Sequence, residues 1–469
     1  MSHEHEHEPH DDGDHLEEED IIEVVEDEGD EPMDDDDDDN DKYDGEIIIG
    51  APMPGEEEEM MRDMENQVVQ EDNSWGASAL HEPQQSIFTL SLHPSFPNPP
   101  LAISGGEDDL AFIFCPIPPV EGPSGVLYPC NTDSFPATKL TGHTDSVVAA
   151  GWSFDGEMVA TGGMDGRVRV WRRVAGKAPE GDVIGQWKNW EFLTSLETGS
   201  EITWLSWHPK GNVLAAGCED ATVWMWQLPS GNTMTVLSSH TLPSSAGVFP
   251  APGRTLLTAS LDSSLCLWDP RSSAPLFKSS IFAAPNAMEL DPAEAGITAL
   301  AVAPSGSLAA VGGAAGGVKL VNLPKGDTVG KLEGHGEGES VEALVFVDLL
   351  AGAGGGKGVV LVSGGTDGKG FVWDVATGRV RAEIKHDEPI TSLAPHPSPQ
   401  LHLVTSASAD GMLKTWDVRT GALVAEHKGH AGVVNGVAVA PGPVGLDGSA
   451  GGQVVVSAGD EGVSLIWKL

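Results

Sequence analysis

The chain has 469 residues, with 72 acidic and 25 basic side chains and a formal net charge of −47. A nucleic-acid binder needs a basic surface for the phosphates, so this balance disfavours that class and favours a basic protein partner. The sequence contains no apolar run of about 18 residues and no basic-then-apolar signal pattern, so we expect neither a membrane span nor a secretory peptide.

The acidity is concentrated at the amino terminus. The first 80 residues hold 33 acidic side chains and only two basic ones, Lys42 and Arg62. Such a segment cannot bury enough apolar surface to offset its chain entropy, so we predict a disordered acidic tail over residues 1–72 and a folded domain over residues 73–469. The tail histidines lack the fixed geometry that a metal site requires, and we expect neither metal nor cofactor.

Eight similar units follow the tail. Each unit carries Gly or Ser, then an acidic turn, then alternating apolar residues that run into a closing residue. The closing residues are Phe114, Trp171, Trp226, Trp268, Asn322, Trp373, Trp416 and Trp467. They lie 42 to 57 residues apart, which with insertions is the period of a propeller blade. The sequence therefore predicts an all-β, eight-bladed β-propeller, whose fifth unit (Ile297 to Asn322) lacks the acidic turn and the aromatic residue.

The second unit shows the strand pattern most clearly. Alternating apolar residues predict strands over Val147–Trp152, Met158–Thr161 and Val168–Trp171, and Asp165-Gly166 between the last two favours a tight hairpin turn. The segment Trp75–Leu80 precedes the first unit as a fourth strand would. We predict that it completes the last blade and so closes the ring, which protects the sheet edges.

Four units repeat a histidine, a hydroxyl residue, an aspartate and a tryptophan in register. A Ser-His-Asp hydrolase needs one activated, exposed set, whereas four sets in register indicate buried networks that tie the strands of each blade together. We therefore predict that the protein is not an enzyme. The predicted structural sets are His143, Thr161, Asp165 and Trp171; His240, Thr258, Asp262 and Trp268; His335, Ser363, Asp367 and Trp373; and His386, Ser406, Asp410 and Trp416.

One rim of a propeller is built from the loop that enters the first strand of each blade and from the turn between the second and third strands. Alignment of the units places acidic residues but no Lys or Arg at these positions. The acidic set is Glu107, Glu201, Glu219, Glu342 and Asp460, and the apolar set is Phe88, Val148, Met164 and Leu261. Asp108 and Glu461 occupy adjoining turn positions, where we expect them to serve the buried networks first and the partner second. Acids around a few apolar residues suit a short basic peptide. The alternative is an ordinary solvated rim.

The Gly-His to Trp-Asp repeats over residues 75–469 resemble the WD40 β-propeller family. The acidic tail, Ile103 to Asp109, Trp204 to Trp207 and Trp224-Met-Trp226 resemble, more narrowly, a eukaryotic group that contains a dedicated chaperone of large-subunit ribosomal protein L10 and the angio-associated migratory cell protein. The resemblance implies a chaperone that captures the basic N-terminal segment of that ribosomal protein on its acidic rim and delivers it to the pre-large ribosomal subunit. The degenerate fifth unit departs from the pattern.

Two other classes of function stay open at this stage. A general interaction scaffold, such as a ubiquitin-ligase receptor or a signalling adaptor, uses the same fold. A histone-tail binder would also carry an acidic rim, although a methyl-lysine reader needs an aromatic cage and the rim offers only Phe88. The four scattered cysteines favour a reducing compartment. We expect a cytoplasmic monomer, with the nucleus as a second location, no direct contact with nucleic acid and no membrane partner.

Overall fold

The computed structural model describes residues 71–118, 120–121, 127–128, 136–175, 185–282, 296–352, 358–443 and 452–469. The chain divides into two units, residues 1–68 and 69–469, and the second contains every described residue. The predicted acidic tail, apart from residues 71 and 72, therefore lies outside the described residues, as does Cys130. Cys218 and Cys266 are buried free thiols.

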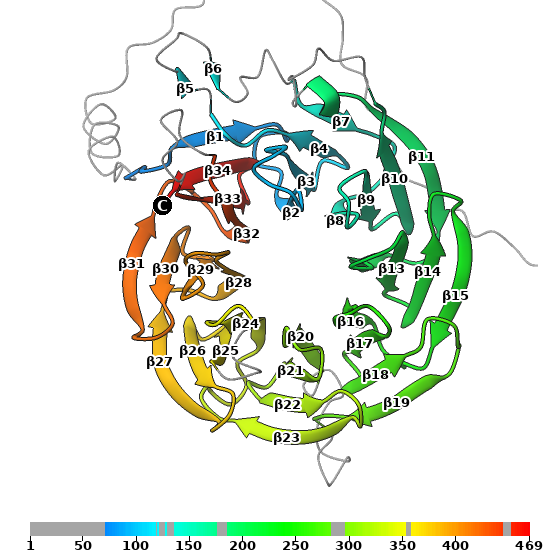
Figure 1. The fold of residues 1–469 in the computed structure, drawn as a ribbon, viewed down its shortest axis with the longest axis vertical. Helices are drawn as coiled ribbons and strands as arrows, with labels where there is room; N and C mark the ends of the chain where they lie inside the picture. Colours follow the sequence, from blue (N-terminus) through cyan, green and yellow to red (C-terminus); the bar gives the residue numbers. More distant parts are fainter. Residues whose placement is uncertain are drawn as a thin grey trace, which may run out of the picture. The chain divides into compact units, whose positions relative to one another are not determined.

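Eight four-stranded antiparallel sheets form a ring in the second unit, and Figure 1 shows the view down its axis. The first four blades consist of β2 (Ile87–Leu92), β3 (Ala102–Gly106), β4 (Ala111–Phe114) and β7 (Thr138–Leu140); β8 (Val147–Trp152), β9 (Met158–Gly163), β10 (Arg167–Arg173) and β11 (Trp190–Glu197); β12 (Ile202–Trp207), β13 (Val213–Cys218), β14 (Thr222–Gln227) and β15 (Asn232–Ser238); and β16 (Ser244–Val248), β17 (Leu256–Ser260), β18 (Ser264–Trp268) and β19 (Pro275–Ser280).

The next three blades consist of β20 (Ile297–Val302), β21 (Leu308–Gly313), β22 (Val318–Asn322) and β23 (Asp327–Leu332); β24 (Val341–Asp348), β25 (Val359–Gly365), β26 (Lys369–Asp374) and β27 (Arg379–Lys385); and β28 (Ile390–Pro395), β29 (Leu403–Ser408), β30 (Leu413–Asp417) and β31 (Ala422–His427). The eighth contains β32 (Val434–Pro441), β33 (Gln453–Gly459), β34 (Val463–Lys468) and β1 (Gly76–Ala79). A small hairpin, β5 (Val120–Glu121) with β6 (Leu127–Tyr128), and one 3₁₀ turn, η1 (Gly185–Trp187), complete the described elements. The predicted eight-bladed, all-β fold is confirmed.

The ring closes through strands from both ends of the domain. Strand β1 pairs antiparallel with β34, with Gly76 opposite Ile466 and Ala79 opposite Val463. The Asn73 side chain reinforces this junction, because its Oδ1 accepts hydrogen bonds from Trp467 Nε1 at 2.9 Å and from the Lys428 backbone N–H at 2.8 Å. The segment Trp75–Leu80 therefore supplies the outer strand of the eighth blade (Figure 1).

Burial along the strands explains the sequence pattern. The second strand of a blade is covered on both faces by neighbouring blades, so all six residues of β9 and of β29 are buried. These strands use small and β-branched residues such as the Leu403–Ser408 run, which fit between closely packed sheets. Outer strands, in contrast, bury only alternate or scattered positions. Trp226, Trp268 and Trp373, at most 1% exposed, fill the space between blades.

The outer strands carry a device that protects their free edges. In the second to seventh blades the register between the third and fourth strands shifts by one residue near the end of the third strand, for example between Met225 and Trp226. In the fifth blade the shift between Leu320 and Val321 shows that Val321, not Asn322, occupies the closing position. A bulge of this kind twists an edge strand and discourages pairing with another chain. Within the described ranges, no helix is long and apolar enough to cross a membrane.

Candidate functional site

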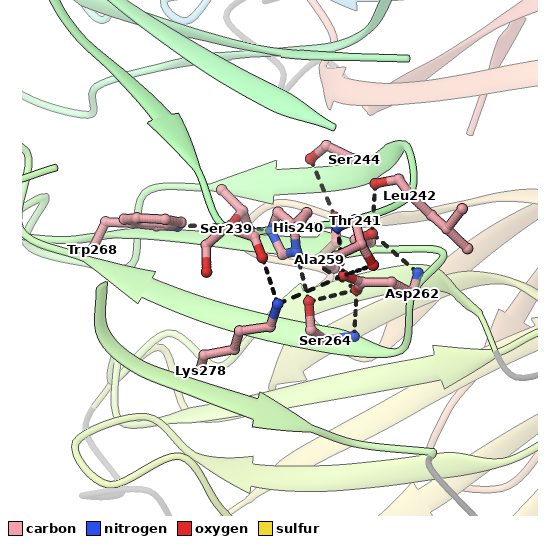
Figure 2. A network of polar contacts seen from close by, with 12 residues as sticks. Ser239, His240, Thr241, Leu242, Ser244, Ala259, Asp262, Ser264, Trp268 and Lys278 are labelled. Atoms are coloured by element: carbon pink, nitrogen blue, oxygen red, sulfur yellow. Dashed lines mark hydrogen bonds and ion pairs between the residues drawn. The ribbon is translucent and has the colours of Figure 1, made fainter. Parts of the chain in front are cut away.

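Buried polar networks anchor one end of the strands, and the fourth blade shows one in full (Figure 2). Thr258 Oγ1 accepts a hydrogen bond from Trp268 Nε1 at 2.8 Å and bonds His240 Nε2 at 2.8 Å. His240 Nδ1 bonds Ser264 Oγ at 2.7 Å, and Asp262 lies behind this serine, 3.7 Å from the imidazole. Asp262 accepts the backbone N–H groups of Thr241 and Ser264, both at 2.8 Å. The network ties the turn and the entering loop to the strands, which is a structural role.

The sixth and seventh blades repeat this arrangement. In the seventh, His386 bonds Asp410 at 2.9 Å and Ser406 at 2.7 Å, and Trp416 donates to Ser406 at 2.9 Å. The corresponding residues of the sixth blade, His335, Ser363, Asp367 and Trp373, are joined by bonds of 2.8 to 3.2 Å.

The second blade is a partial case. His143 bonds Asp165 and Thr161 as predicted, at 3.1 and 2.8 Å. Trp171, in contrast, packs edge-on against Phe192 and lies beneath the Arg169 guanidinium. The expected four-residue set is therefore a triad here, because the arginine covers the tryptophan.

Two further networks lie in the first and eighth blades, where the sequence analysis expected a network role for Asp108 and Glu461 but did not identify the complete sets. In the first blade His81 bonds Asp108 at 2.8 Å and Ser104 at 2.9 Å, and in the eighth His430 bonds Glu461 and Ser457. Neither blade places a tryptophan in its network, so the four-residue pattern did not find them; Gly-His at the start of the eighth unit was the available signal. In the fifth blade Phe282 lies against Gly313, where Gly163 and Gly365 of other blades meet the network histidine.

Two buried histidines outside these networks, His93 and His427, predict that the fold is sensitive to acid. Desolvation lowers the pKa of His93 and of His427 to about 4, from about 6.5 in an unfolded chain. Between these pH values the unfolded chain binds protons that the folded chain excludes. The contribution of the two neutral histidines to the free energy of unfolding is therefore fully present above pH 6.5 and is lost as the pH falls towards 4. Each group contributes about 3 kcal/mol to that loss at pH 4. Burial lowers the pKa of His81, His143, His335 and His396 in the same direction.

Urea midpoints at pH 7, 6 and 5 measure this loss. The control is His427→Gln, which removes one titrating group from the buried chain that links His427 to His396 through Thr415 and Thr405. We expect a shallower pH dependence for this variant than for the unmodified protein. A midpoint that is constant from pH 7 to pH 5 would contradict the prediction.

The loops above these networks form one face of the ring, which we call the turn face: it contains the turn between the second and third strands of every blade. Its innermost positions form a bulge ring. Each first strand skips one residue in its register with the second strand, and a bulge of this kind re-aims a side chain. The eight skipped residues are Phe88, Val148, Thr203, Ser245, Thr298, Glu342, Thr391 and Asn435.

Half of the bulge ring joins neighbouring blades. Thr203 Oγ1 donates to the Ser244 carbonyl at 2.6 Å, and Thr298 Oγ1 to the Val341 carbonyl at 2.7 Å. Thr391 and Asn435 make the same contact with the carbonyls of Val434 and Ile87. In each case the acceptor directly precedes the bulge of the next blade. These four side chains are therefore committed to the ring, whereas Glu342 and Phe88 are exposed.

A second set of equivalent positions, the turn ring, opens the turn between the second and third strands. Each backbone N–H in it donates to a carbonyl of the loop that enters the same blade, at 2.9 to 3.1 Å. Its residues are Glu107, Met164, Glu219, Leu261, Ala314, Thr366, Ala409 and Asp460. The entering-loop acceptors include Glu201. Across the two rings and these acceptors there are five acidic residues and no Lys or Arg.

The structure brings the predicted acids onto this face in two ways. Glu107, Glu201, Glu219 and Glu342 are exposed. Asp460 is half-buried, and its carboxylate accepts a hydrogen bond from Ser86 Oγ, while the Ser86 backbone N–H donates to Glu107 Oε2 at 3.1 Å. Ser86 thus holds two carboxylates of neighbouring blades close together. The result is a fixed concentration of negative charge at the junction of the eighth and first blades.

Two predicted rim residues require correction. The Asp108 side chain is only 1% exposed and pairs with His81, so it stabilises the first blade and is not accessible to a partner. Glu461 pairs with His430 and is about one quarter exposed, which leaves little of its carboxylate for another ligand. Both follow the turn-ring residue by one position, where the blade networks take their carboxylates.

The sequence alignment also missed two acids on this face. Burial raises the pKa of Asp109, and the charges of Asp145, Asp108 and Asp165 raise it further. The carboxylates of the first and second blades therefore repel one another, which is the condition that a basic ligand relieves. Asp145 is exposed and follows His143 by two residues in the loop that enters the second blade.

The apolar side chains predicted at the rim differ in exposure. Phe88 and Met164 are exposed, at 39% and 42%, and belong to the bulge ring and the turn ring respectively. Val148 and Leu261 are half-buried. Phe88 and Met164 belong to neighbouring blades, the first and the second, and both offer exposed apolar surface on the turn face. Among the described residues, no group of three or more potential ligands is arranged to hold a metal ion.

Comparison with known proteins agrees with this architecture. The model of the WD domain, G-beta repeat, matches residues 134–172, 231–269 and 378–417, and that of the anaphase-promoting complex subunit 4 WD40 domain matches residues 179–246. An uncharacterised WD repeat-containing protein of Schizosaccharomyces pombe is 32% identical over 315 residues, which cover 66% of this chain and 68% of that protein.

Human angio-associated migratory cell protein is 29% identical over 394 residues, which cover 80% of this chain and 78% of that protein. The ribosome assembly protein SQT1 of Saccharomyces cerevisiae is 24% identical over 433 residues, 88% of this chain and 91% of its own length. The crystal structure of Chaetomium thermophilum Sqt1 bound to the N-terminus of ribosomal protein L10 aligns with a TM-score of 0.65 and 24% identity, over 85% of this chain and 100% of that one. At this identity the structural likeness establishes the shared fold.

Proposed function

The chain belongs to the WD40-repeat β-propeller family, and we propose that it is a dedicated chaperone for a basic ribosomal protein of the L10 type. It binds the N-terminal segment of this client on its turn face, keeps the client soluble and delivers it to the pre-large ribosomal subunit. The observation that carries the proposal is the composition of that face: five acids and no Lys or Arg at the equivalent positions of eight blades. The choice of client is supported by the similarity to the yeast ribosome assembly protein SQT1 and to the Chaetomium thermophilum Sqt1 structure, which contains the N-terminus of L10.

The chemistry of the turn face suits capture followed by release. Carboxylates form charge-assisted hydrogen bonds with arginine and lysine, and such bonds are stronger than neutral ones. Exposed pairs also accelerate encounter and weaken as salt rises, so the client can leave when ribosomal RNA offers more phosphates. Phe88 and Met164 add apolar contact, which distinguishes a peptide with a matching side chain from one that is merely basic.

We further propose that the protein acts as a monomer in the cytoplasm, where ribosomal proteins are synthesised. A scaffold that only bridges other proteins would not need five acids from four blades to face one way. A histone-tail binder would use the same charge, so the choice of client must be tested with peptides of equal charge.

Co-expression with the client tests the chaperone activity. Produced alone, a basic ribosomal protein of the L10 type should aggregate; with the full-length chain, most of it should stay in the supernatant and co-purify in a one-to-one complex. A core histone is the matched control and should gain no solubility. The proposal would be wrong if the client remained insoluble, or if both proteins were rescued equally.

A further inference from the structure

The face opposite the turn face carries a basic pocket between the third and fourth blades. It has a volume of about 580 Å³. Its walls come from the loop after β12, the loop between β16 and β17, the turn after β18 and the exposed residue Met234 of β15. Because these loops join the strand ends remote from the turns, the pocket cannot share a ligand residue with the turn face.

The pocket floor is a fixed structure. His208 Nε2 donates to the Gly253 carbonyl at 2.8 Å, and His208 Nδ1 accepts the Lys210 backbone N–H at 3.1 Å. The same imidazole packs edge-on against Phe249, with ring centroids 5.3 Å apart. Gly253 has φ +95°, and a Cβ there would lie 2.6 Å from His208 Nε2, so only glycine fits. The floor, formed by His208 of the third blade and Phe249 and Gly253 of the fourth, is thus fixed by contacts between the two blades.

Two arginines line this pocket, Arg254 and Arg271, and both are exposed. Within the described part of the chain, neither guanidinium makes a hydrogen bond or an ion pair. The chain has 25 basic residues against 72 acidic ones, so two unpaired arginines at one pocket give this part of the surface a sign of charge opposite to that of the chain as a whole. A guanidinium presents a planar fork of donors that matches a carboxylate.

The seventh blade provides an internal comparison. Asp417-Val418-Arg419 and Asp269-Pro270-Arg271 both begin the turn after the third strand of their blade, and in both the arginine backbone N–H donates to the aspartate, at 2.9 and 3.0 Å. The Arg419 guanidinium then closes on Asp417, with bonds of 2.9 and 2.6 Å. Arg271 makes no such pair with Asp269. The arginine of an Asp-x-Arg turn is therefore neutralised within the turn in the seventh blade and left available for a ligand in the fourth.

We propose that this pocket is a second binding site, which takes an acidic peptide segment of a partner protein, with a carboxylate beside an aromatic or aliphatic side chain. The arginines would hold the carboxylate, and Phe249 and Met234 would hold the apolar group. A nucleic acid fits less well, because a phosphate backbone needs an extended basic surface and this pocket offers only two arginines. The site does not depend on capture of a basic client, and it would let one ring hold two partners of opposite charge.

Methyl spectra of the full-length protein with [13C-methyl]methionine test the inference. Met234 reports on the pocket and Met164 on the turn face, and Leu substitutions at the two positions assign the signals. The probe is the blocked peptide Asp-Glu-Phe-Glu-Asp-Leu. It should shift the Met234 signal and leave Met164 unchanged, and Arg254→Gln with Arg271→Gln should weaken its binding about tenfold or more.

The control variant, Arg379→Gln with Arg419→Gln, removes two positive charges elsewhere and should bind the probe as the unmodified protein does. A silent Met234 signal, or equal binding by the pocket variant, would overturn the inference. Inorganic phosphate or oligouridylate moving Met234 while the peptide does not would overturn it in favour of a phosphate ligand. A basic peptide that shifts Met164 tests the proposed chaperone function separately.

Discussion

Replacing Glu107 and Glu342 by lysine should weaken binding of the L10 N-terminal peptide by at least about a hundredfold, because interfacial charge pairs commonly couple by more than 1 kcal/mol and reversal adds repulsion. Both side chains are exposed, on the first and sixth blades, so the double variant presents two positive charges on the turn face. Calorimetric titration of the full-length variant with the peptide measures the effect. The fold should survive, since Glu107 gives up one hydrogen bond, from the Ser86 N–H, and Glu342 none that the structure shows.

The matched control is Asp327→Lys with Glu383→Lys, which changes the net charge equally on the outer strands β23 and β27. This variant should bind the peptide within a fewfold of the unmodified protein, because exposed charges beyond about 10 Å are screened. If both variants lost affinity to the same extent, binding would depend on net charge alone and the turn face would not be the site.

Trp268→Ala should destabilise the propeller by about 3–5 kcal/mol, the cost of removing a large aromatic side chain from a packed core. Trp268 is fully buried and packs with Leu256 and Cys266 in the core between the third and fourth blades. Its loss also removes the donor to Thr258, which is itself fully buried. Urea midpoint and Tm measure the change.

Two further variants separate the loss of packed volume from the loss of the hydrogen bond. Trp268→Phe keeps most of the volume but removes the indole N–H, and should cost about 1 kcal/mol. Trp224→Ala removes a half-buried tryptophan that packs against the core between the second and third blades, and should cost less than Trp268→Ala. A loss below about 1 kcal/mol for Trp268→Ala would mean that the repeated network does not stabilise the blade.

The repeat could be predicted because it depends on residues that are close together in the sequence. Apolar residues alternate over Val147–Trp152, Asp165-Gly166 favours a turn, and the interval between closing residues recurs. The predicted number of blades is therefore correct, and the predicted bounds of β8 match the structure at both ends. Trp75–Leu80 was placed by counting strands, and β1 lies there. These features depend on neighbours in sequence, where periodicity and turn chemistry are informative.

The site was harder to predict because its geometry depends on contacts between blades. Asp460 occupies the predicted ring position, but only the coordinates show that its carboxylate bonds Ser86 of the next blade. The availability of Arg271, in a turn that matches that of Arg419, depends on an ion pair that only coordinates reveal. Phe282 in place of a histidine was hidden by the loss of the repeat pattern around it.

The most direct test of the central claim is calorimetric titration of the full-length protein with the L10 N-terminal peptide at low and high salt, beside a histone-tail peptide of equal charge. The account predicts tight binding of the ribosomal peptide, weaker at high salt, and at least about tenfold weaker binding of the histone peptide, which lacks the side chains for Phe88 and Met164. Equal binding of the two peptides, or no binding of the ribosomal one, would contradict it.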